Sequence, residues 1–341
     1  MPEDLTVMVV DPGARGHVIS ERYEISPHVK RIIAASANDF VGFNRRKEVI
    51  VDGNGCHTNP DAILALAMKY KPDLIDVAQD DALALGAVDL LRENKFTVFG
   101  PTQAAAQIEW DKAWSRKFQK RYGIPHPDFR IYTDRVLAKK YIEQLFDDVP
   151  RRRVWVKAAG LAAGKGAISA RTIAEAYSAI DAMDGFKEAG ETFLLESDID
   201  PNGEEYSIYA LSDGVNYYIF KSAQDYKRAH DGDKGPNTGG MGAISPAMVT
   251  RGIEGDIEEQ MIRRAIEGMS VEGRPFKGVL YLGGMKKSDG SSSVVEYNAR
   301  FGDPETQVVL PGLKTDYVDA VSAVIEGRLD GLKIEEDGKT R

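Results

Sequence analysis

The sequence predicts an α/β protein whose N-terminal part is a doubly wound parallel sheet. Short apolar segments alternate with amphipathic segments through about residue 100, and the first apolar segment runs into a glycine-containing turn. A strand, a glycine turn and a helix in this order are typical of the start of a nucleotide-binding α/β domain. Because each later strand is reached through a helical crossover, we expect the strands to lie parallel.

Local signals place the elements of this first part. Strands are expected at residues 5–10, 31–35, 74–78 and 96–99. A helix is expected at 61–70, since Asn59-Pro60 is a helix start signal and apolar residues recur with helical spacing after it. A second helix is expected at 81–93, and Gly100-Pro101 ends the last strand.

The second part of the chain alternates less regularly. A helix is expected at 102–123 and a long glycine-rich loop at 229–243. Further strands are expected at 154–157, 192–196, 206–211, 217–221, 279–285 and 293–298, and further helices at 173–183, 253–269 and 316–326. With 341 residues the chain is long for one hydrophobic core, so we expect two or three domains.

Composition and charge exclude several classes of protein. The formal net charge of −9 argues against a general nucleic-acid binder, and no apolar run is long enough to predict a membrane span. Cys56 is the only cysteine, so no internal disulfide can form. The N-terminal residues carry no signal-peptide pattern. We therefore expect a cytoplasmic protein with neither nucleic acid nor membrane as partner.

The most informative segment is the expected strand end at Glu296 and Asn298. Residues i and i+2 of a strand point to the same face, so these two oxygen donors lie side by side. They suit Mg²⁺, which binds one or two protein carboxylates and takes its other ligands from phosphate and water. Arg300 follows on that face and can bind an anion through two hydrogen bonds. The segment therefore favours ATP-dependent chemistry.

Two glycine-rich segments are further candidates. Residues 157–166 carry Lys157 and Lys165 among small residues, which lets backbone N–H groups approach a phosphate, although Gly166 in place of Ser or Thr excludes a Walker A motif. A flexible surface hairpin is the alternative. Residues 225–243 combine Asp225 and Arg228 with many glycines, which favours close approach to a ligand over a solvated charge cluster beside a linker.

The first strand–helix turn is a weaker candidate. Gly13, Arg15 and His17 lie where a helix N-terminus can bind phosphate, but glycine turns and single histidines are also common in purely structural roles. The histidines show no spacing typical of a metal site.

Five segments occur in the order and at about the spacing of one enzyme family. They are residues 100–107, 157–166, 224–228, 235–242 and 296–307. Together they resemble the ATP-grasp superfamily and, within it, the phosphoribosylamine–glycine ligase family. The resemblance runs from the first strand to about residue 325.

The resemblance implies an ATP-grasp fold, in which two α+β subdomains clasp ATP, and a ligase that uses ATP, glycine and 5-phosphoribosylamine. The glycine carboxylate attacks the γ-phosphate to give glycyl phosphate, and the amine of phosphoribosylamine then attacks that acyl phosphate. Such chemistry depends on positioning and charge neutralisation more than on a protein nucleophile. Mg²⁺ or Mn²⁺ is the implied metal, and a monomer or weak homodimer the implied assembly.

The resemblance also implies roles for single residues. The implied ATP-binding residues are Lys112, Lys157, Gly160, Gly164, Lys165, Gly166, Glu196, Ile199 and Glu205. The implied metal ligands are Glu296 and Asn298, and the implied catalytic residues are Arg300 and Asp225. The implied substrate-binding residues are Gly13, Arg15, His17, Asp80, Lys227, Arg228, Asn237, Thr238, Gly239, Gly240, Gly302 and Asp303. The loop at Lys165 is expected to close over ATP.

The sequence departs from the family pattern near the phosphoribosyl end. The family's first turn reads Gly-Asn-Gly-Gly-Arg-Glu-His, whereas residues 11–17 read Asp-Pro-Gly-Ala-Arg-Gly-His. Asp80 replaces the family's glutamate, and Tyr226 stands where histidine is usual. We expect a Rossmann-like domain at 1–103, an ATP-grasp domain at 104–325 with a lid at about 121–192, and at 326–341 only the start of the family's C-terminal region.

Three other functions remain open. One is an ATP-grasp ligase that uses a different amine, which the altered first turn favours and the intact 300–307 segment disfavours. A second is a non-catalytic nucleotide-binding protein, against which the retained Lys112, Lys157, Glu296 and Asn298 argue. A third, a dinucleotide oxidoreductase, lacks support because the first turn has no Gly-x-Gly-x-x-Gly pattern.

Overall fold

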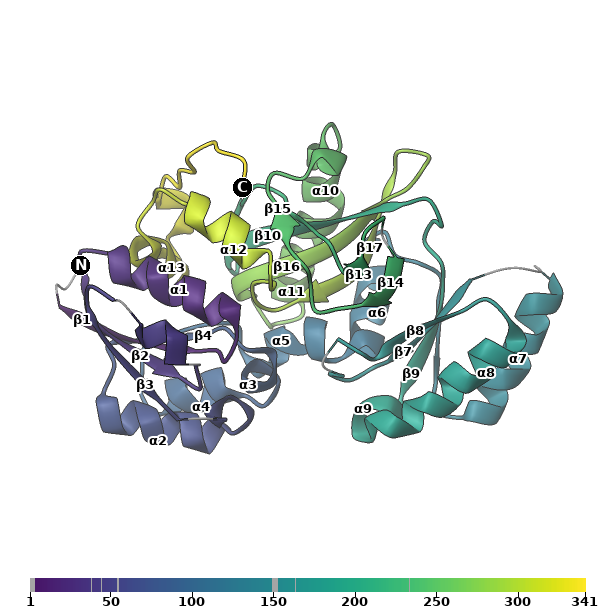
Figure 1. Cartoon of the computed structure of the whole chain (residues 1–341), viewed down its shortest axis with the longest axis horizontal. Helices are drawn as coiled ribbons and strands as arrows, with labels where there is room; N and C mark the ends of the chain where they lie inside the picture. The colour runs from purple at the N-terminus through teal and green to yellow at the C-terminus, as the bar shows by residue number, and fades with distance from the viewer. Residues whose placement is uncertain are drawn as a thin grey trace.

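The computed structural model describes residues 4–37, 39–43, 45–53, 55–148, 153–162, 164–232 and 234–341, without the side chains of Asp39 and Asn237. One parallel sheet and two four-stranded antiparallel sheets dominate the fold (Figure 1). No helix in these ranges is long and apolar enough to cross a membrane.

The N-terminal sheet has five parallel strands in the order β3-β2-β1-β4-β5. Its strands are β1 (Leu5–Val10), β2 (Val29–Ala35), β3 (Glu48–Asp52), β4 (Leu74–Val77) and β5 (Val98–Phe99). The expected doubly wound parallel sheet is therefore confirmed. β3 was not expected, since this edge strand is only partly buried and begins and ends in an acidic residue. The strand order reverses between β1 and β4, and ligands bind at such a point in open α/β sheets.

Helices cover both faces of this sheet (Figure 1). One face packs on α2 (Pro60–Tyr70) and α4 (Ala87–Glu93), and the other on α1 (Ala14–Ile25) and on α13 (Tyr317–Glu326) from the far end of the chain. The single helix expected at 81–93 is wrong: α3 (Asp80–Ala84) and α4 are separated at Gly86, which has φ 81°. A left-handed residue ends an α-helix.

The helix expected at 102–123 is also divided in two. α5 (Gln103–Trp110) ends at Asp111, whose side chain accepts a hydrogen bond from the Trp114 N–H and so caps α6 (Lys112–Arg121). Because a new helix starts there, Lys112 occupies the first position of α6, and its amino group reaches the Gly160 carbonyl at 3.2 Å.

A small antiparallel sheet, which we call the lid sheet, has the order β6-β9-β7-β8. Its strands are β6 (Phe129–Tyr132), β7 (Val154–Ala158), β8 (Ala167–Ala170) and β9 (Phe193–Ser197). Its helices are α7 (Arg135–Asp148), α8 (Ile173–Asp181) and the short α9 (Glu188–Glu191), and the first two enclose a hydrophobic core of its own. The elements β6, α7 and β8 were not expected from the sequence.

The second antiparallel sheet, the central sheet, has the order β11-β10-β16-β17. Its strands are β10 (Glu204–Asp213), β11 (Tyr217–Ile219), β16 (Lys277–Lys286) and β17 (Ser292–Asn298). It packs on α10 (Glu254–Ile257) and α11 (Arg264–Val271), joined by a π-helical turn at Glu258–Arg263, and α12 (Thr306–Val309) follows β17. The expected loop at 229–243 instead contains a hairpin of β13 (Arg228–His230) and β14 (Lys234–Asn237), and β12 (Gln224–Asp225) pairs with β15 (Ala243–Ile244).

Candidate functional site

The end of β17 carries the candidate metal ligands. Glu296 lies opposite Gly283 and Asn298 opposite Tyr281 on the neighbouring strand, so both side chains stand on one face of the central sheet. Glu296 is exposed to solvent, whereas Asn298 is 7% exposed. In the part of the chain that the structure describes, the buried Asn298 amide nitrogen has no hydrogen-bond partner. A buried polar group without a partner is costly, so this side chain is free to receive a ligand.

The charges of three lysines act on Glu296. Desolvation raises the pKa of Glu296, but Lys112, Lys227 and Lys157 outweigh it and hold this pKa below its usual value. Desolvation lowers the pKa of Lys112, which Glu296 opposes. An ionised Glu296 beside the Asn298 amide fits a hard divalent cation, because a half turn of the amide presents its oxygen without breaking a hydrogen bond. The surplus positive charge suits a polyphosphate.

Glu196 has a structural role toward one of these lysines. Its carboxylate is 2% exposed, accepts two hydrogen bonds from Arg116 at 2.6 and 3.0 Å, and pairs with Lys157 at 2.8 Å. Desolvation raises the pKa of Glu196, but these cations lower it to about 2. The side chain therefore aims Lys157 and takes no part in the adenine role expected of the backbone of this segment, where the Ser197 N–H donates to the Asp128 carbonyl.

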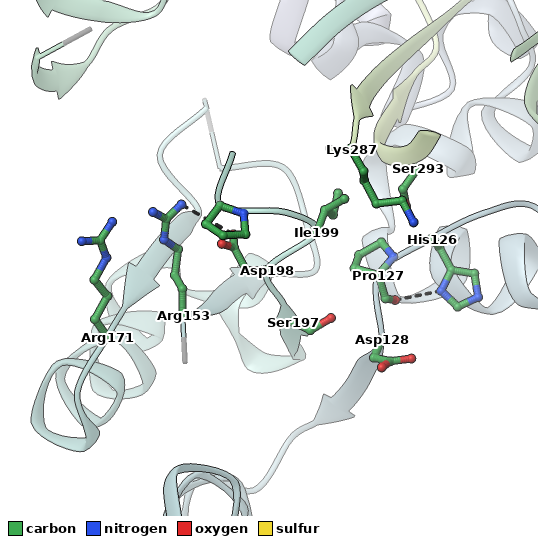
Figure 2. Close-up of a pocket in the computed structure, with 11 residues that line it drawn as sticks. His126, Pro127, Asp128, Arg153, Arg171, Ser197, Asp198, Ile199, Lys287 and Ser293 are labelled. Atoms are coloured by element: carbon green, nitrogen blue, oxygen red, sulfur yellow. Dashed lines mark hydrogen bonds and ion pairs between the residues drawn. The ribbon is translucent and has the colours of Figure 1, made fainter. Parts of the chain in front are cut away.

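A cavity of about 900 Å³ opens at the end of β9. Figure 2 shows Ile199 between Arg153 and Asp198 on the lid side and Lys287 on the central-sheet side. Glu296, Lys112 and Arg300 are not among its lining residues. The cavity thus lies apart from these three residues, along the segment expected to receive the base of a nucleotide.

Lys227 joins two of the expected ligand-binding carboxylates. Its amino group lies 2.7 Å from Glu205 and 3.8 Å from Asp225. Desolvation raises the pKa of Asp225 to about 6, against the opposing charge of Lys227. Asp225 can thus release or accept a proton near neutral pH.

Arg300 is held by two carboxylates from the N-terminal part of the chain. Its guanidinium lies 2.8 Å from Glu109 and 3.7 Å from Asp80. Glu109 also accepts the Ala299 N–H at 2.8 Å, and desolvation raises its pKa against the charge of Arg300. The Nε of Arg300 is buried and has no partner in the described structure, so one donor remains for a ligand.

The residues that follow Arg300 pack closely against the central sheet. A Cβ on Gly302 would lie 2.3 Å from the Tyr209 hydroxyl and 2.5 Å from Glu305 Oε2, so only glycine fits. Glu305 accepts hydrogen bonds from the Ser207 and Tyr281 hydroxyls at 2.9 and 3.2 Å. This anchor fixes the loop that follows Arg300 against β10 and β16 of the central sheet, and β16 is the strand paired with β17.

Comparison with protein families assigns both parts of the chain. The family model "Phosphoribosylglycinamide synthetase, N domain" matches residues 5–109, and "Phosphoribosylglycinamide synthetase, ATP-grasp (A) domain" matches residues 110–306. The chain belongs to the phosphoribosylglycinamide synthetase family. The ATP-grasp fold and the family expected from the five sequence segments are both confirmed.

Curated relatives of the phosphoribosylglycinamide synthetase family agree. A phosphoribosylamine–glycine ligase of Streptococcus pyogenes is 36% identical over 340 residues, which cover 98% of this chain and 78% of the relative. One of Chlorobaculum tepidum is 39% identical over 97% of this chain and 77% of its own length. The crystal structure of phosphoribosylamine–glycine ligase from Thermotoga maritima superposes with a TM-score of 0.76 at 26% identity, covering 95% of this chain and 76% of that one. N5-carboxyaminoimidazole synthetase of Staphylococcus aureus, at 14% identity, 98% and 81% coverage and TM-score 0.68, shares the fold.

The first turn, where this chain departs from the phosphoribosylglycinamide synthetase pattern, is closed by its own side chains. Asp11 Oδ1 accepts the N–H groups of Gly13 at 2.7 Å and Gly16 at 3.1 Å. Asp303 accepts the Arg15 N–H at 3.2 Å. The 7%-exposed Arg15 guanidinium donates to Asp11, to the Gln79 side chain and to the Phe301 carbonyl.

Several expected site residues lie outside this set of contacts. His17 contacts Glu21 and Arg45, and the exposed Arg228 donates to the Gly235 carbonyl. Lys165 and Gly164 are exposed on the loop after β7, whereas Gly160 is half-buried and Gly166 is buried. Gly239 and Gly240 continue from Thr238, which bonds the Lys227 carbonyl, whereas the Asn237 side chain lies outside the described atoms.

Three residues of the site were missed by sequence reasoning: Glu109, Arg116 and Glu305. Each is a buried charged residue, and charged residues are rarely buried without a partner. A charge on an otherwise apolar helix face, such as Glu109 one turn after the buried Ala105 and Ala106 of α5, is the signal that could have found one of them.

Proposed function

We propose that this protein ligates glycine to 5-phosphoribosylamine at the expense of ATP, through glycyl phosphate, to give glycinamide ribonucleotide, ADP and phosphate. Membership of the phosphoribosylglycinamide synthetase family supports this reaction. The observation that carries it is the pair of Glu296 and the buried Asn298, which has no partner for its amide nitrogen among the described residues, on one face of β17, where the charges of Lys112, Lys157 and Lys227 act on Glu296.

The first step is phosphorylation of glycine. A glycine carboxylate oxygen attacks the γ-phosphorus of ATP, the bond to the β-phosphate oxygen breaks, and ADP leaves. Lys112 and Lys157 bind the phosphates and offset their charge, while backbone groups near Glu196 and Ile199 hold adenine and Glu205 the ribose. Glu296 and Asn298 would hold Mg²⁺ or Mn²⁺, which draws charge from the phosphate oxygens when bound.

The second step forms the amide bond. The amine nitrogen of phosphoribosylamine attacks the glycyl carbonyl carbon, phosphate leaves with the bonding electrons, and the nitrogen loses a proton. Arg300 and Asp225 orient the carboxyl and amine groups, and Asp80, Lys227, Arg228 and the loops at 237–240 and 302–303 complete the substrate site. Closure of the loop that carries Lys165 excludes water, which protects the acyl phosphate from hydrolysis.

We further propose a cytoplasmic monomer or weak homodimer that has no nucleic-acid or membrane partner. Residues 1–103 form its N-terminal domain and 104–325 its ATP-grasp domain, in which residues 121–192 serve as the lid.

ADP release tests the proposed reaction. The protein is assayed with ATP and Mg²⁺, with glycine and phosphoribosylamine supplied together or singly. We expect turnover only with both substrates, and glycine with hydroxylamine should give glycyl hydroxamate because hydroxylamine captures acyl phosphates. A well-folded protein that shows no glycine-dependent ADP release with either nucleophile would overturn the proposal.

A further inference from the structure

The N-terminus of α1 stands where an anionic ligand is expected. It follows β1 at the point where the strand order of the parallel sheet reverses. Free N–H groups and the helix dipole make such a position attractive to phosphate. In the proposed reaction the only substrate that brings a phosphate to this end is the acceptor, 5-phosphoribosylamine.

In this chain, side chains of the protein itself bind the N–H groups at this helix terminus. Asp11 Oδ1 takes the N–H groups of Gly13 and Gly16, and Asp303 Oδ2 takes that of Arg15. The Arg15 side chain, a cation in the first turn of α1, is bound by Asp11 at 2.8 Å and by two further oxygens. Asp11 therefore occupies both the helix terminus and the cation that a phosphate would use.

The local charge also opposes a phosphate. Asp80 and Glu109 lie beside Arg300, so this junction holds the carboxyl groups of Asp11, Asp80, Glu109 and Asp303 against the guanidinium groups of Arg15 and Arg300. An incoming dianion would meet more negative than positive groups.

The packing of the first turn also restricts the residue at position 16, which is glycine. A Cβ at position 16 would lie 2.7 Å from the Asp11 Cβ and 2.8 Å from the Asp11 carbonyl oxygen. The close approach of the backbone in this turn thus requires glycine at position 16, and the Gly16 N–H then reaches the Asp11 carboxylate.

We propose that Asp11 is a specificity-determining residue: it takes the place of an acceptor phosphate at α1, so the enzyme recognises this end of its acceptor through hydroxyl groups. This inference rests on the proposed function and names the acceptor class as glycosylamines with or without a phosphate.

The kinetic test compares 5-phosphoribosylamine with ribosylamine, each formed in solution from ammonia and the matching sugar. We expect the two kcat/KM values to agree within about tenfold in the unmodified protein, and D11G to favour the phosphorylated acceptor by about tenfold more, since a charged hydrogen bond contributes about that factor. A preference of about a hundredfold or more for phosphoribosylamine in the unmodified protein overturns the inference and leaves the proposed function standing.

A binding test decides the inference even without turnover. Calorimetry with ribose 5-phosphate should show affinity that rises from the unmodified protein to Asp11→Asn, which removes the charge, and rises again in Asp11→Gly, which also frees the N–H groups. Asp73→Asn is the matched control, because Asp73 accepts the Thr6 N–H at the opposite, N-terminal end of the strands β1 and β4. Unchanged affinity in both Asp11 variants, with circular dichroism unaltered, overturns the inference.

Discussion

Glu296 is the single residue on which the proposed chemistry depends most. It is the one carboxylate of the candidate metal pair, and three lysines keep it ionised. Glu296→Gln keeps the shape of the side chain and removes its charge. We expect glycine-dependent ADP release to fall by about a hundredfold or more, because several kcal/mol of charge stabilisation by the metal are lost.

Glu204→Gln is the matched control for this change. Glu204 is exposed at the start of β10 and lies opposite Lys286. The control should retain its rate, and thermal unfolding of both variants should match that of the unmodified protein. A Glu296→Gln rate that recovers to normal at saturating Mg²⁺ would remove Glu296 from the metal site.

Among the elements, β9 and β17 are tied together through one side chain on α6. Arg116 binds Glu196 of β9 through two hydrogen bonds and donates to the carbonyls of Val294 and Val295 in β17. We expect Arg116→Ala to lower the free energy of unfolding by about 3–5 kcal/mol, since it leaves the buried Glu196 carboxylate with one cation. Urea unfolding measures the loss.

The double variant Arg116→Ala with Glu196→Ala separates charge from packing. It should be less destabilised than the sum of the two single variants, because no uncompensated carboxylate remains. Additive losses would show that packing, and not the ion pair, links the two strands.

The elements also show how far the sequence predicts the site. Lys112, Lys157, Glu296 and Asn298 could be found because each lies in a local motif. Arg116 could not, since its partner Glu196 lies 80 residues away along the chain, and Glu109 is marked only by its place on an apolar helix face. Likewise the strands of the parallel sheet follow from hydrophobic pattern, whereas the helix breaks at Gly86 and Asp111 depend on single residues inside helical patterns.

At the scale of the whole molecule, Asp76 connects α1 near the start of the chain with α13 near residue 320. This buried carboxyl of β4 accepts hydrogen bonds from Tyr23 in α1 at 2.9 Å and from Tyr317 in α13 at 3.3 Å. Desolvation raises the pKa of Asp76 to about 7 from the model-compound value of 3.8. Because folding raises this pKa, the contribution of Asp76 to the free energy of unfolding is complete below pH 3.8. This contribution is lost as pH rises to about 7.

Asp76→Asn removes this dependence. We expect the variant to gain stability relative to the unmodified protein as pH rises from about 4 to 7, by a few kcal/mol at most, with no further gain above that. Chemical unfolding of both proteins across this range measures the difference. A difference that does not change with pH would show that Asp76 keeps one protonation state throughout.

The packing of α13 on the N-terminal sheet has a consequence for biosynthesis. Residues 317–326 complete a face of a sheet whose strands end at residue 99. Translation proceeds at about 5–20 residues per second, so this face stays partly bare on the ribosome for roughly 10–40 s. During that interval Leu5, Val7 and Val29 lack their contacts with α13, and a chaperone that binds apolar strands would bind at these residues.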